Sequence, residues 1–585
     1  MDRRTFLSGG ALGAGIALYG HWPSRSVSAV GLDGIYNVRA YGAVGDGVNN
    51  DFAAIQAAIN DASNAGGQVH FPSGVYFIGT GILTTTAIGA AKLSIRGAGK
   101  HLSRILKSAG TPTHTLDVRF TGASVVDVQD LSISGPTGLG FSNGSVGLIW
   151  ITGGLAHQLR LDQVAIMGTH DHGILNSGGG HVELIDVDIE SVDVCAAMFE
   201  STNTPDCADI VVRGGTWGTP NGDLSSQGSV GLYVHPHIPY NVSGVTFRKL
   251  GRYAFYQNGS PGSKRRPSVA SHCQLIDCEL AQTKGTGLSV FDGCSVRGTS
   301  SGLGSSLGGH VILSGCAFER AGPIGYGPIA TSEVLINGSV FVNTPVFSAG
   351  GAGKKWQMVG SAFRLNDEGF ALPSSQMLAC IGGRTVLADS EFVDETTTFA
   401  YQTPVALSGT DPHLRLQNVG FSGGKGSLSS GVRAGAGSIQ VESCRFDAGS
   451  KKEAISCVGG FPVNGLEGSN NQFLNGAYAF VSGIQQRLTR RPGVNPLPIA
   501  SVADMDAGSS AMCNWDTHVV TGGAVINSLA NPQGFVGQVS LIAAAGASWS
   551  TSAAGNISPL TTAPRSPNTV VTLLWVPTAG KWLEV

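Results

Sequence analysis

A short pattern recurs through most of the chain and limits what it can fold into. The pattern reads apolar, any residue, turn residue, small or apolar, any residue, large apolar. Thirteen segments fit it: VQDLSI (128–133), LDQVAI (161–166), LIDVDI (184–189), VRGGTW (212–217), VSGVTF (242–247), LIDCEL (275–280), LSGCAF (313–318), INGSVF (336–341), MVGSAF (358–363), LADSEF (387–392), LQNVGF (416–421), VESCRF (441–446) and GSNNQF (468–473). The last positions run from Ile133 to Phe473, so twelve steps give a mean period of about 28 residues. A period of this size is typical of solenoids and propellers.

The third position of the pattern separates these architectures. It is Gly, Asn or Asp in eleven of the thirteen segments, and only Gln163 and Ser443 differ. Gly, Asn and Asp tolerate a positive φ, which a one-residue left-handed corner between two strands requires. A leucine-rich repeat would need a recurrent L-x-x-L-x-L frame, and a four-stranded propeller blade needs about 40 residues. The sequence therefore predicts an all-β protein built on a right-handed parallel β-helix of about 13 coils.

Composition agrees with this fold and excludes some functions. Gly accounts for 86 of the 585 residues, apolar residues for 42% and charged residues for only 13%, with a formal net charge of −3. The apolar content argues against a disordered chain. The weak charge gives no electrostatic basis for binding nucleic acid, so no nucleic-acid partner is expected.

The repeat also explains several acids and cysteines. Asp130, Asp186, Asp277 and Asp389 stand at the turn position, which makes them turn residues rather than catalytic acids. Cys278, Cys316 and Cys444 stand at the small inward position, which predicts buried free thiols. The chain has no CxxC pair and no Cys/His zinc spacing, so no metal site is predicted. A Ca²⁺ site is an open alternative without a clear oxygen-ligand motif.

The stretch YGAVGDGVNNDFAAIQAAIN (41–60) predicts a cap for the first coil. An amphipathic helix follows from the apolar residues Phe52, Ile55, Ile59 and Ala62. Asp51 is placed to cap its N-terminus, and Asp46 in GDG is interpreted as a turn residue. GGQVHFPSGVYFIG (66–79) then predicts a turn, a strand, a Pro-Ser-Gly turn and another strand. This acidic stretch is thus expected to begin the fold and not to form the active site.

The N-terminus predicts export. MDRRTFLSGGALGAGIALYG places Arg3 and Arg4 ahead of a short apolar stretch, and SVSA supplies small residues for a signal peptidase. The segment resembles a bacterial twin-arginine signal, although Asp2 and Ser8 depart from that pattern. It implies the twin-arginine translocase as an export partner, a mature chain beginning near Val30, and a periplasmic or extracellular location. A Sec signal or an N-terminal anchor is the alternative.

Residues 36–79 resemble the N-terminal signature of the pectate-lyase superfamily, and more narrowly the rhamnogalacturonase/epimerase-like pectate lyase domain. With the repeats, the resemblance extends over roughly residues 33–487 and implies a right-handed parallel β-helix. Such families contain polysaccharide lyases, glycoside hydrolases, uronate epimerases and phage tailspikes, so the fold does not choose the chemistry. GTHDHG (168–173) is faintly similar to the Asp-Pro-His motif of alginate epimerases but lacks the proline. No catalytic residue carries over from the resemblance.

A row of strands following the corners predicts a sugar-binding surface. The segments are GILN (173–176), AMFE (197–200), GLYVH (231–235), YAFYQ (253–257) and GLSVFD (287–292). With Ile174, Met198, Leu232, Ala254 and Leu288 pointing inward, alternation points seven others outward: Phe199, Tyr233, Phe255, Ser289, His235, Gln257 and Phe291. Scattered surface aromatics are the alternative interpretation.

Polar residues on and beside these strands supply candidate chemistry. The predicted catalytic residues are His235, His237, Lys264, Arg265, Asp171 and Asp292; the predicted substrate-binding residues are Tyr233, Phe255, Gln257, Tyr240, His172 and Glu200. In a β-elimination, His235 or His237 would be the base, while Lys264 and Arg265 would hold the uronate carboxylate. A hydrolase would instead use two carboxylates, for which Glu200, Asp171 and Asp292 are the candidates. Hydrogen-bonded loop histidines and a solvated basic loop are the commoner case.

The tail is expected to be a separate unit. RRPGVNPLP (490–498) predicts a linker, and the strands of TVVTLLWVPTAGKWLEV (569–585) resemble small β-modules that finish phage tail fibres. The predicted organisation is a signal peptide at 1–29, a cap and first coils at 30–110, the β-helix at 111–487, a linker at 488–499 and a small C-terminal β-sandwich-like module at 500–585. The module would bind carbohydrate or form a homotrimer, or would simply cap the last coil.

Together these features predict an exported polysaccharide-active enzyme without a cofactor. A lyase that cleaves an acidic polysaccharide by β-elimination is favoured over a hydrolase or epimerase. The alternative is a non-catalytic glycan-binding protein or a tailspike-like surface protein.

Overall fold

The computed structural model describes most of the main body and short parts of the tail. The described residues are 34–87, 92–108, 114–120, 124–135, 147–153, 157–168, 172–190, 194–200, 208–218, 229–235, 238–257, 267–283, 287–298, 304–325, 332–348, 355–366, 376–395, 403–423, 431–447, 453–457, 466–469, 471–474, 478–481, 511–512, 517–520, 525–526, 529–530, 538–543, 550–551, 557–560, 563, 570–576, 579 and 581–585. The predicted signal (1–29) and linker (488–499) lie outside these residues.

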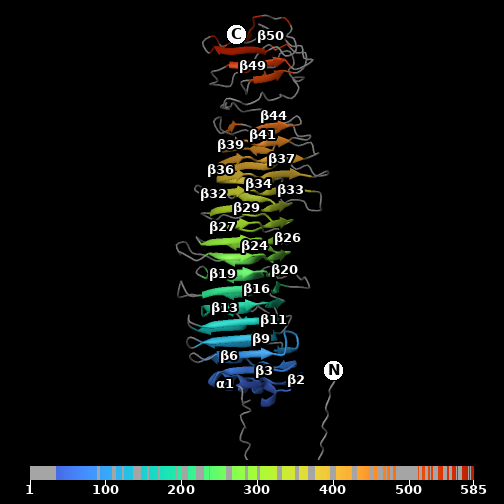
Figure 1. The fold of residues 1–585 in the computed structure, drawn as a ribbon, viewed down its shortest axis with the longest axis vertical. Helices are drawn as coiled ribbons and strands as arrows, with labels where there is room; N and C mark the ends of the chain where they lie inside the picture. Colours follow the sequence, from blue (N-terminus) through green and yellow to red (C-terminus); the bar gives the residue numbers. More distant parts are fainter. Residues whose placement is uncertain are drawn as a thin grey trace, which may run out of the picture.

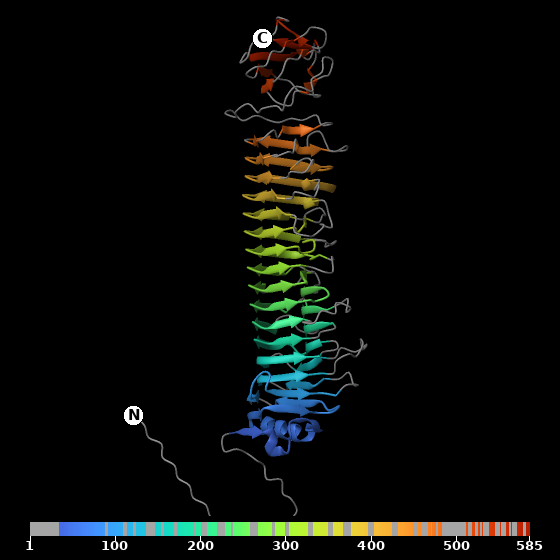
Figure 2. The ribbon, with the colours of Figure 1, turned by 90° about the vertical axis from the view of Figure 1, so that its right-hand side faces the viewer.

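The main body is a column of parallel strands, in which each coil pairs with the next (Figures 1 and 2). Three stacks of strands run along the column. This confirms the predicted parallel β-helix, with a helix at its N-terminal end. Side chains alternate along each strand, so every stack buries one face in the column and turns the other outward.

The first stack contains β1 Ile35–Asn37, β3 Gly67–Phe71, β6 Lys92–Gly97, β9 Val125–Ser134, β11 Gln158–Met167, β13 Gly180–Ile185, β16 Ala208–Arg213, β19 Tyr240–Ser243, β22 Ser268–Ser271, β25 Leu288–Asp292, β27 Gly309–Ser314, β29 Ser332–Asn337, β32 Lys355–Val359, β34 Gln376–Ala388, β36 Thr403–Gln417, β39 Ser438–Glu442 and β42 Leu466–Ser469.

The second stack contains β2 Asp46–Asn50, β4 Gly74–Phe77, β7 Ser103–Leu106, the ends of β9 and β11, β14 Asp188–Glu190, β17 Thr216–Gly218, β20 Thr246–Arg248, β23 Gln274–Ile276, β26 Ser295–Arg297, β28 Ala317–Glu319, β30 Val340–Val342, β33 Ala362–Leu365, β35 Glu391–Asp394, β37 Gly420–Gly423, β40 Arg445–Asp447 and β43 Gln472–Leu474.

The third stack begins as a separate eight-stranded sheet of β5 Leu83–Ala87, β8 Leu116–Phe120, β10 Gly147–Gly153, β12 His172–Asn176, β15 Cys195–Phe199, β18 Val230–Val234, β21 Tyr253–Gln257 and β24 Glu279–Thr283. Single bridges at Ser306 and Ile324 continue it to β31 Val346–Ser348, the first parts of β34 and β36, β38 Val432–Ala434, β41 Glu453–Cys457 and β44 Tyr478–Val481.

Left-handed corners join the first and second stacks. Twelve of the thirteen predicted corner residues are described, and all twelve have φ between 48° and 68°, including Gln163 and Ser443. One assignment was wrong: Asp277 is a second corner of its coil, in line with Lys249 and Arg320. His272 and Gly293 take its place in the main column. In this coil, the two corners His272 and Asp277 are only five residues apart. Because Asp277 fits the repeat pattern, the sequence placed the main corner there and not at His272.

The core is layered in the same register as the corners. Phe318, Phe341, Phe363, Phe392, Phe421 and Phe446 occupy the large apolar position of successive coils. Their rings stack with centroids 4.6–5.0 Å apart and interplanar angles of 2–14°. The small position beside the corner holds thiols, and Cys278, Cys316 and Cys444 are free and buried, as predicted.

The N-terminal cap forms as expected, except that Asp51 does not cap the helix. Helix α1, Phe52–Ala65, buries Ile55 and Ile59 against the first coils. Asp51 precedes the helix without capping it, because its carboxylate accepts hydrogen bonds from the backbone N–H groups of Val44 (2.6 Å) and Gly45 (3.1 Å). Asp46 accepts from the N–H groups of Val48 and Asn49, which lowers its pKa. A 3₁₀ turn, η1 Val38–Tyr41, precedes this loop.

The tail forms further small sheets beyond β44 (Figure 1). Their strands are β45 Ala511–Met512, β46 Thr517–Val520, β47 Val525–Ile526, β48 Leu529–Ala530, β49 Gln538–Ala543, β50 Ser550–Thr551, β51 Ile557–Ser558, β52 Val570–Val576 and β53 Lys581–Glu584. The largest sheet buries Val571, Leu573 and Trp582. Among the described residues of the whole chain, no helix has the length and apolarity to cross a membrane.

Candidate functional site

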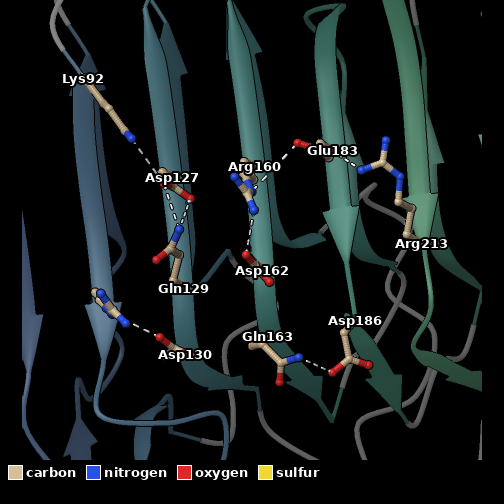
Figure 3. A network of polar contacts seen from close by, with 11 residues as sticks. Lys92, Asp127, Gln129, Asp130, Arg160, Asp162, Gln163, Glu183, Asp186 and Arg213 are labelled. Atoms are coloured by element: carbon tan, nitrogen blue, oxygen red, sulfur yellow. Dashed lines mark hydrogen bonds and ion pairs between the residues drawn. The ribbon is translucent and has the colours of Figure 1, made fainter.

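Two outward faces of the column carry many polar residues, and they differ in how these residues are used. On the first stack, Figure 3 shows a ladder of charges across β6, β9, β11, β13 and β16. Arg160 lies 2.8 Å from Asp162 and 3.9 Å from Glu183, and Arg213 lies 3.0 Å from Glu183. Since opposite charges on neighbouring strands neutralise one another, this face is best explained as structural.

The eight-stranded sheet instead presents a mixed aromatic and polar row. One outward row runs across its strands in register: Asp117, Trp150, Leu175, Met198, Tyr233, Tyr256 and Gln282. On each strand the residues before and after this row point into the core, as Leu232 and Val234 do on either side of Tyr233 in β18. Because side chains alternate along a strand, the row itself points away from the core. Trp150, Met198, Tyr233, Tyr256 and Gln282 are partly exposed, whereas Asp117 and Leu175 are covered by neighbouring residues.

Two tyrosines form the centre of this row. The rings of Tyr233 and Tyr256 are stacked, with centroids 4.9 Å apart and an angle of 10° between their planes. The ring centroid of Tyr253 lies 6.3 Å from that of Tyr256. The pKa of Tyr253 is raised, mainly because its hydroxyl group is buried. Tyr256 belongs to this row, although the sequence pattern did not predict it. The pair provides a flat aromatic surface of the kind on which the apolar face of a sugar ring stacks.

His235 and Glu200 stand beside this aromatic pair on consecutive coils. Each residue directly follows the end of its strand and continues the backbone hydrogen bonding between the strands. The N–H of His235 donates to Phe199 O (3.0 Å), and the N–H of Glu200 donates to Asn176 O (2.7 Å). Because Phe199 and Val234 are buried, alternation turns Glu200 and His235 outward. The imidazole centroid lies 6.1 Å from that of Tyr233. A base and a carboxyl group therefore lie on neighbouring strands at the same end of the aromatic surface, which suits proton transfer on a bound sugar.

The structure places Phe255 and Gln257 inside the column, so the prediction that they point outward was wrong. Phe255 is in register with Leu232, and Gln257 with Val234. Phe255 is 1% exposed, and the Gln257 side-chain oxygen accepts a hydrogen bond from Ser289 Oγ (3.0 Å). The error is a slip of one residue, which exchanges the two faces of a strand. The same slip placed Phe199 outward and Met198 inward.

Tyr240 and His172 are also buried and do not form part of this face. Tyr240 begins β19 in the first stack, where its ring stacks on Phe255 at 5.6 Å and burial raises its pKa. His172 begins β12 and is 5% exposed. Neither side chain can contact a ligand on the outward row without rearrangement of the coil.

Asp292 lies on a different stack from the tyrosines. It ends β25, which pairs with β22 and β27 in the first stack, whereas β24 continues the eight-stranded sheet. The burial of β25 is also inverted relative to the prediction, because Ser289 and Phe291 point inward. This coil is short, so the strand after the corner was assigned to the wrong side of the column.

Four predicted site residues lie outside the described residues: Asp171, His237, Lys264 and Arg265. The described part of the face therefore unites Tyr233, His235 and Glu200 from the predicted set. One sequence signal could have given the correct register of these strands. On each of four strands a Gly or Ala comes directly before the inward apolar residue: Gly173-Ile174, Ala196-Ala197, Gly231-Leu232 and Ala254-Phe255. Within the residues that the structure describes, no three His, Cys, Asp or Glu side chains gather as a metal site would require.

Comparison with known proteins agrees with this architecture. Residues 35–229 match the family model described as rhamnogalacturonase A/epimerase, pectate lyase-like. The matched residues span the N-terminal cap and the first coils of the parallel β-helix. Among curated proteins, the mannuronan C5-epimerases AlgE1 and AlgE5 of Azotobacter vinelandii are each 55% identical to it over 47 residues. Those residues are 8% of this chain and only 3% and 5% of the two epimerases.

Several solved structures are similar to this chain. The A-module of mannuronan C-5 epimerase AlgE6 of Azotobacter vinelandii is 14% identical, with a TM-score of 0.26, over 68% of this chain and 99% of the module. The Dettilon tailspike protein is 12% identical, with a TM-score of 0.36, over 77% and 69% of the two chains. The catalytic unit of a GH87 α-1,3-glucanase from Streptomyces thermodiastaticus is 14% identical, with a TM-score of 0.28, over 79% and 70%.

Proposed function

We propose that this protein is an exported enzyme that acts on uronate-containing polysaccharides at the outward face formed by β15, β18 and β21. The observation that carries the proposal is the stacked pair Tyr233 and Tyr256, with His235 and Glu200 beside it on consecutive coils. The family model and the short similarity to mannuronan C5-epimerases support a uronate as the sugar.

The proposed reaction begins with removal of the proton next to the uronate carboxyl group. His235 is the proposed base, and a sugar ring stacked on Tyr233 would present that proton to the imidazole. In a β-elimination, the C4–O glycosidic bond breaks as a double bond forms between C4 and C5. The departing oxygen then takes a proton from an acid, and Glu200 on the preceding coil is the proposed donor. If the C4–O bond survives and an acid delivers a proton to the opposite face of C5, the outcome is epimerisation.

The negative charge that develops on the uronate requires positive charge nearby. Lys264 and Arg265, on the segment that follows β21, remain the proposed source. Arginine would hold the carboxylate through two parallel hydrogen bonds, and lysine would act as a point charge.

The test is a panel of mannuronan, polygalacturonate and a neutral glucan. Ultraviolet absorbance detects the unsaturated product of a lyase, a reducing-end assay detects hydrolysis, and proton NMR of the polymer detects epimerisation. His235→Ala should lower turnover by about 10²–10⁴-fold at unchanged melting temperature. Glu183→Gln, on the charge ladder of the first stack, is the control and should retain full turnover.

The outcomes separate the alternatives. New absorbance with mannuronan or polygalacturonate supports the lyase, and altered uronate composition supports the epimerase. Binding of either polymer without any product would support the glycan-binding alternative. Absence of both binding and turnover on the acidic polymers, or full turnover in His235→Ala, would contradict the proposal.

A further inference from the structure

A second aromatic position lies on the same outward row, three strands before Tyr233. Trp150 on β10 is partly exposed, and its indole N–H donates to Ser177 Oγ at 3.0 Å. The ring of His114 lies against the indole, with centroids 4.2 Å apart and planes tilted by 33°. The hydrogen bond and the ring contact hold the indole in one orientation. A ring fixed in this way pays little conformational entropy when a ligand stacks on it.

The support for His114 comes from within the column. The Lys107 ammonium group donates to the backbone carbonyl of His114, and the Lys107 side chain is 2% exposed. The backbone N–H of Lys107 in turn donates to Ser134 O (3.1 Å), which ties the segment to β9. The His114–Trp150 pair therefore rests on a buried polar anchor, unlike a scattered surface aromatic.

An exposed guanidinium, paired with a buried carboxylate, lies beside this tryptophan. Asp117, in register with Trp150, pairs with Arg119: its Oδ2 lies 2.6 Å from Nη2 and 2.8 Å from Nε. The Asp117 side chain is 2% exposed, whereas that of Arg119 is 56% exposed. A buried carboxylate thus orients an exposed guanidinium through Nε and Nη2, and among the described residues no other partner of this guanidinium is found. No group in the described part of the chain donates to the other oxygen of Asp117.

We propose that Trp150 and Arg119 form a binding subsite for an acidic sugar unit of the same glycan. The indole would stack on the sugar ring and the guanidinium would bind the uronate carboxylate, a geometry that suits arginine better than lysine. This inference rests on the proposed function, and it adds a site that the reacting groups do not touch. It also assigns a direction to the glycan, which would run along the column axis.

The spacing sets the size of the ligand. Trp150 and Tyr233 are separated by the strand steps β10–β12, β12–β15 and β15–β18, which amount to about 14 Å at the usual spacing of paired strands. A single sugar bound at Tyr233 does not reach Trp150. The subsite should therefore strengthen binding of long oligosaccharides and leave the shortest ones unaffected.

The experiment is calorimetric titration of the full chain with oligomannuronates and oligogalacturonates of increasing length, from dimer upward, and with their carboxyl-reduced counterparts. Trp150→Ala should weaken the longest oligouronates by up to about tenfold. Arg119→Gln should weaken them by about ten- to a hundredfold and leave the carboxyl-reduced oligomers unchanged. Neither change should affect the dimers.

Arg160→Gln is the matched control. Arg160 also pairs with an aspartate two residues away on its own strand, at 2.8 Å, but on the charge-ladder face. It should leave every affinity unchanged. Trp150→Phe keeps an aromatic face without the Ser177 hydrogen bond and should recover most of the loss, which guards against misfolding of the alanine variant.

Three results would overturn the subsite. Unchanged affinity for long oligouronates in both variants, or equal losses for dimers and long oligomers, would remove Trp150 and Arg119 from the ligand path while leaving the proposed function intact. Equal weakening of acidic and carboxyl-reduced oligomers by Arg119→Gln would remove the acidic specificity. Failure of the unaltered protein to bind any oligouronate would overturn the proposed function and the subsite together.

Discussion

Gln163 and Asp186 occupy the same left-handed corner on successive coils, and the Gln163 side-chain amide donates to the Asp186 carboxylate at 2.6 Å (Figure 3). Their φ angles are 55° and 48°, values that L-residues adopt at a cost. Asn418 and Asp389 repeat the arrangement at 2.7 Å. Hydrogen bonds between stacked corner side chains thus offset part of the backbone strain, and they explain why polar residues replace glycine at these corners.

The corners should therefore discriminate between side chains of similar size. Gly315 has φ 57°, and a Cβ added there would meet no atom within 4 Å. Gly315→Val should cost about 2–3 kcal/mol of unfolding free energy, because a β-branched residue resists positive φ. Gly315→Asn should cost less than about 1 kcal/mol, since asparagine adopts this conformation readily. Thermal unfolding of the two variants provides the measurement, and equal destabilisation would refute the conformational explanation.

Asp51 should be important for stability and unimportant for chemistry. Asp51 is buried, with 2% of its surface exposed. Its carboxylate accepts hydrogen bonds from the backbone N–H groups of Val44 and Gly45. Asp51→Ala leaves both backbone donors without that charged acceptor, so a loss of about 2–3 kcal/mol is expected. Turnover per folded molecule, measured below the melting transition, should stay at the level of the unaltered protein. A folded Asp51→Ala variant without activity would move the active site to the N-terminal cap.

The fold was predictable because one coil repeats its chemistry many times. Corner residues such as Gly244 and Asp389 recur with buried aromatics such as Phe247 and Phe392, so an error at one coil is corrected by the others. The site had no such redundancy. Whether Phe255 or Tyr256 faces outward depends on a single-residue register, and the loops before these strands vary in length. The outward role of Trp150 depends on the contacts of His114 and Ser177, which no local pattern encodes.

Export should depend on the arginine pair near the N-terminus. Arg3→Lys with Arg4→Lys keeps the charge of MDRRTFL but removes the pattern that the twin-arginine translocase recognises. Precursor should accumulate in the cytoplasm, detected by immunoblotting of fractionated cells. A single Arg25→Lys change, outside the pattern, is the control and should be exported normally. Normal export of the double variant would exclude this pathway.

Lys107 should make stability depend on alkaline pH. Its buried ammonium group donates to the His114 carbonyl, and burial lowers the pKa of Lys107 from 10.5 to about 8. Between these two values the unfolded chain holds a proton that the folded chain has released. Folding is therefore favoured increasingly as the pH rises through this window, and the gain is lost as the pH falls through about 8.

Lys107→Met isolates this contribution, because it keeps a long side chain in the same space without a titrating group. The unfolding free energy of the unaltered protein relative to the variant should rise between pH 8 and pH 10.5 and be level below pH 8. Chemical denaturation of both proteins across this range measures the difference, and the other titrating groups, including the buried thiols, largely cancel. A difference that stays flat or falls with rising pH would show that the Lys107 ammonium group is not destabilised by its buried position.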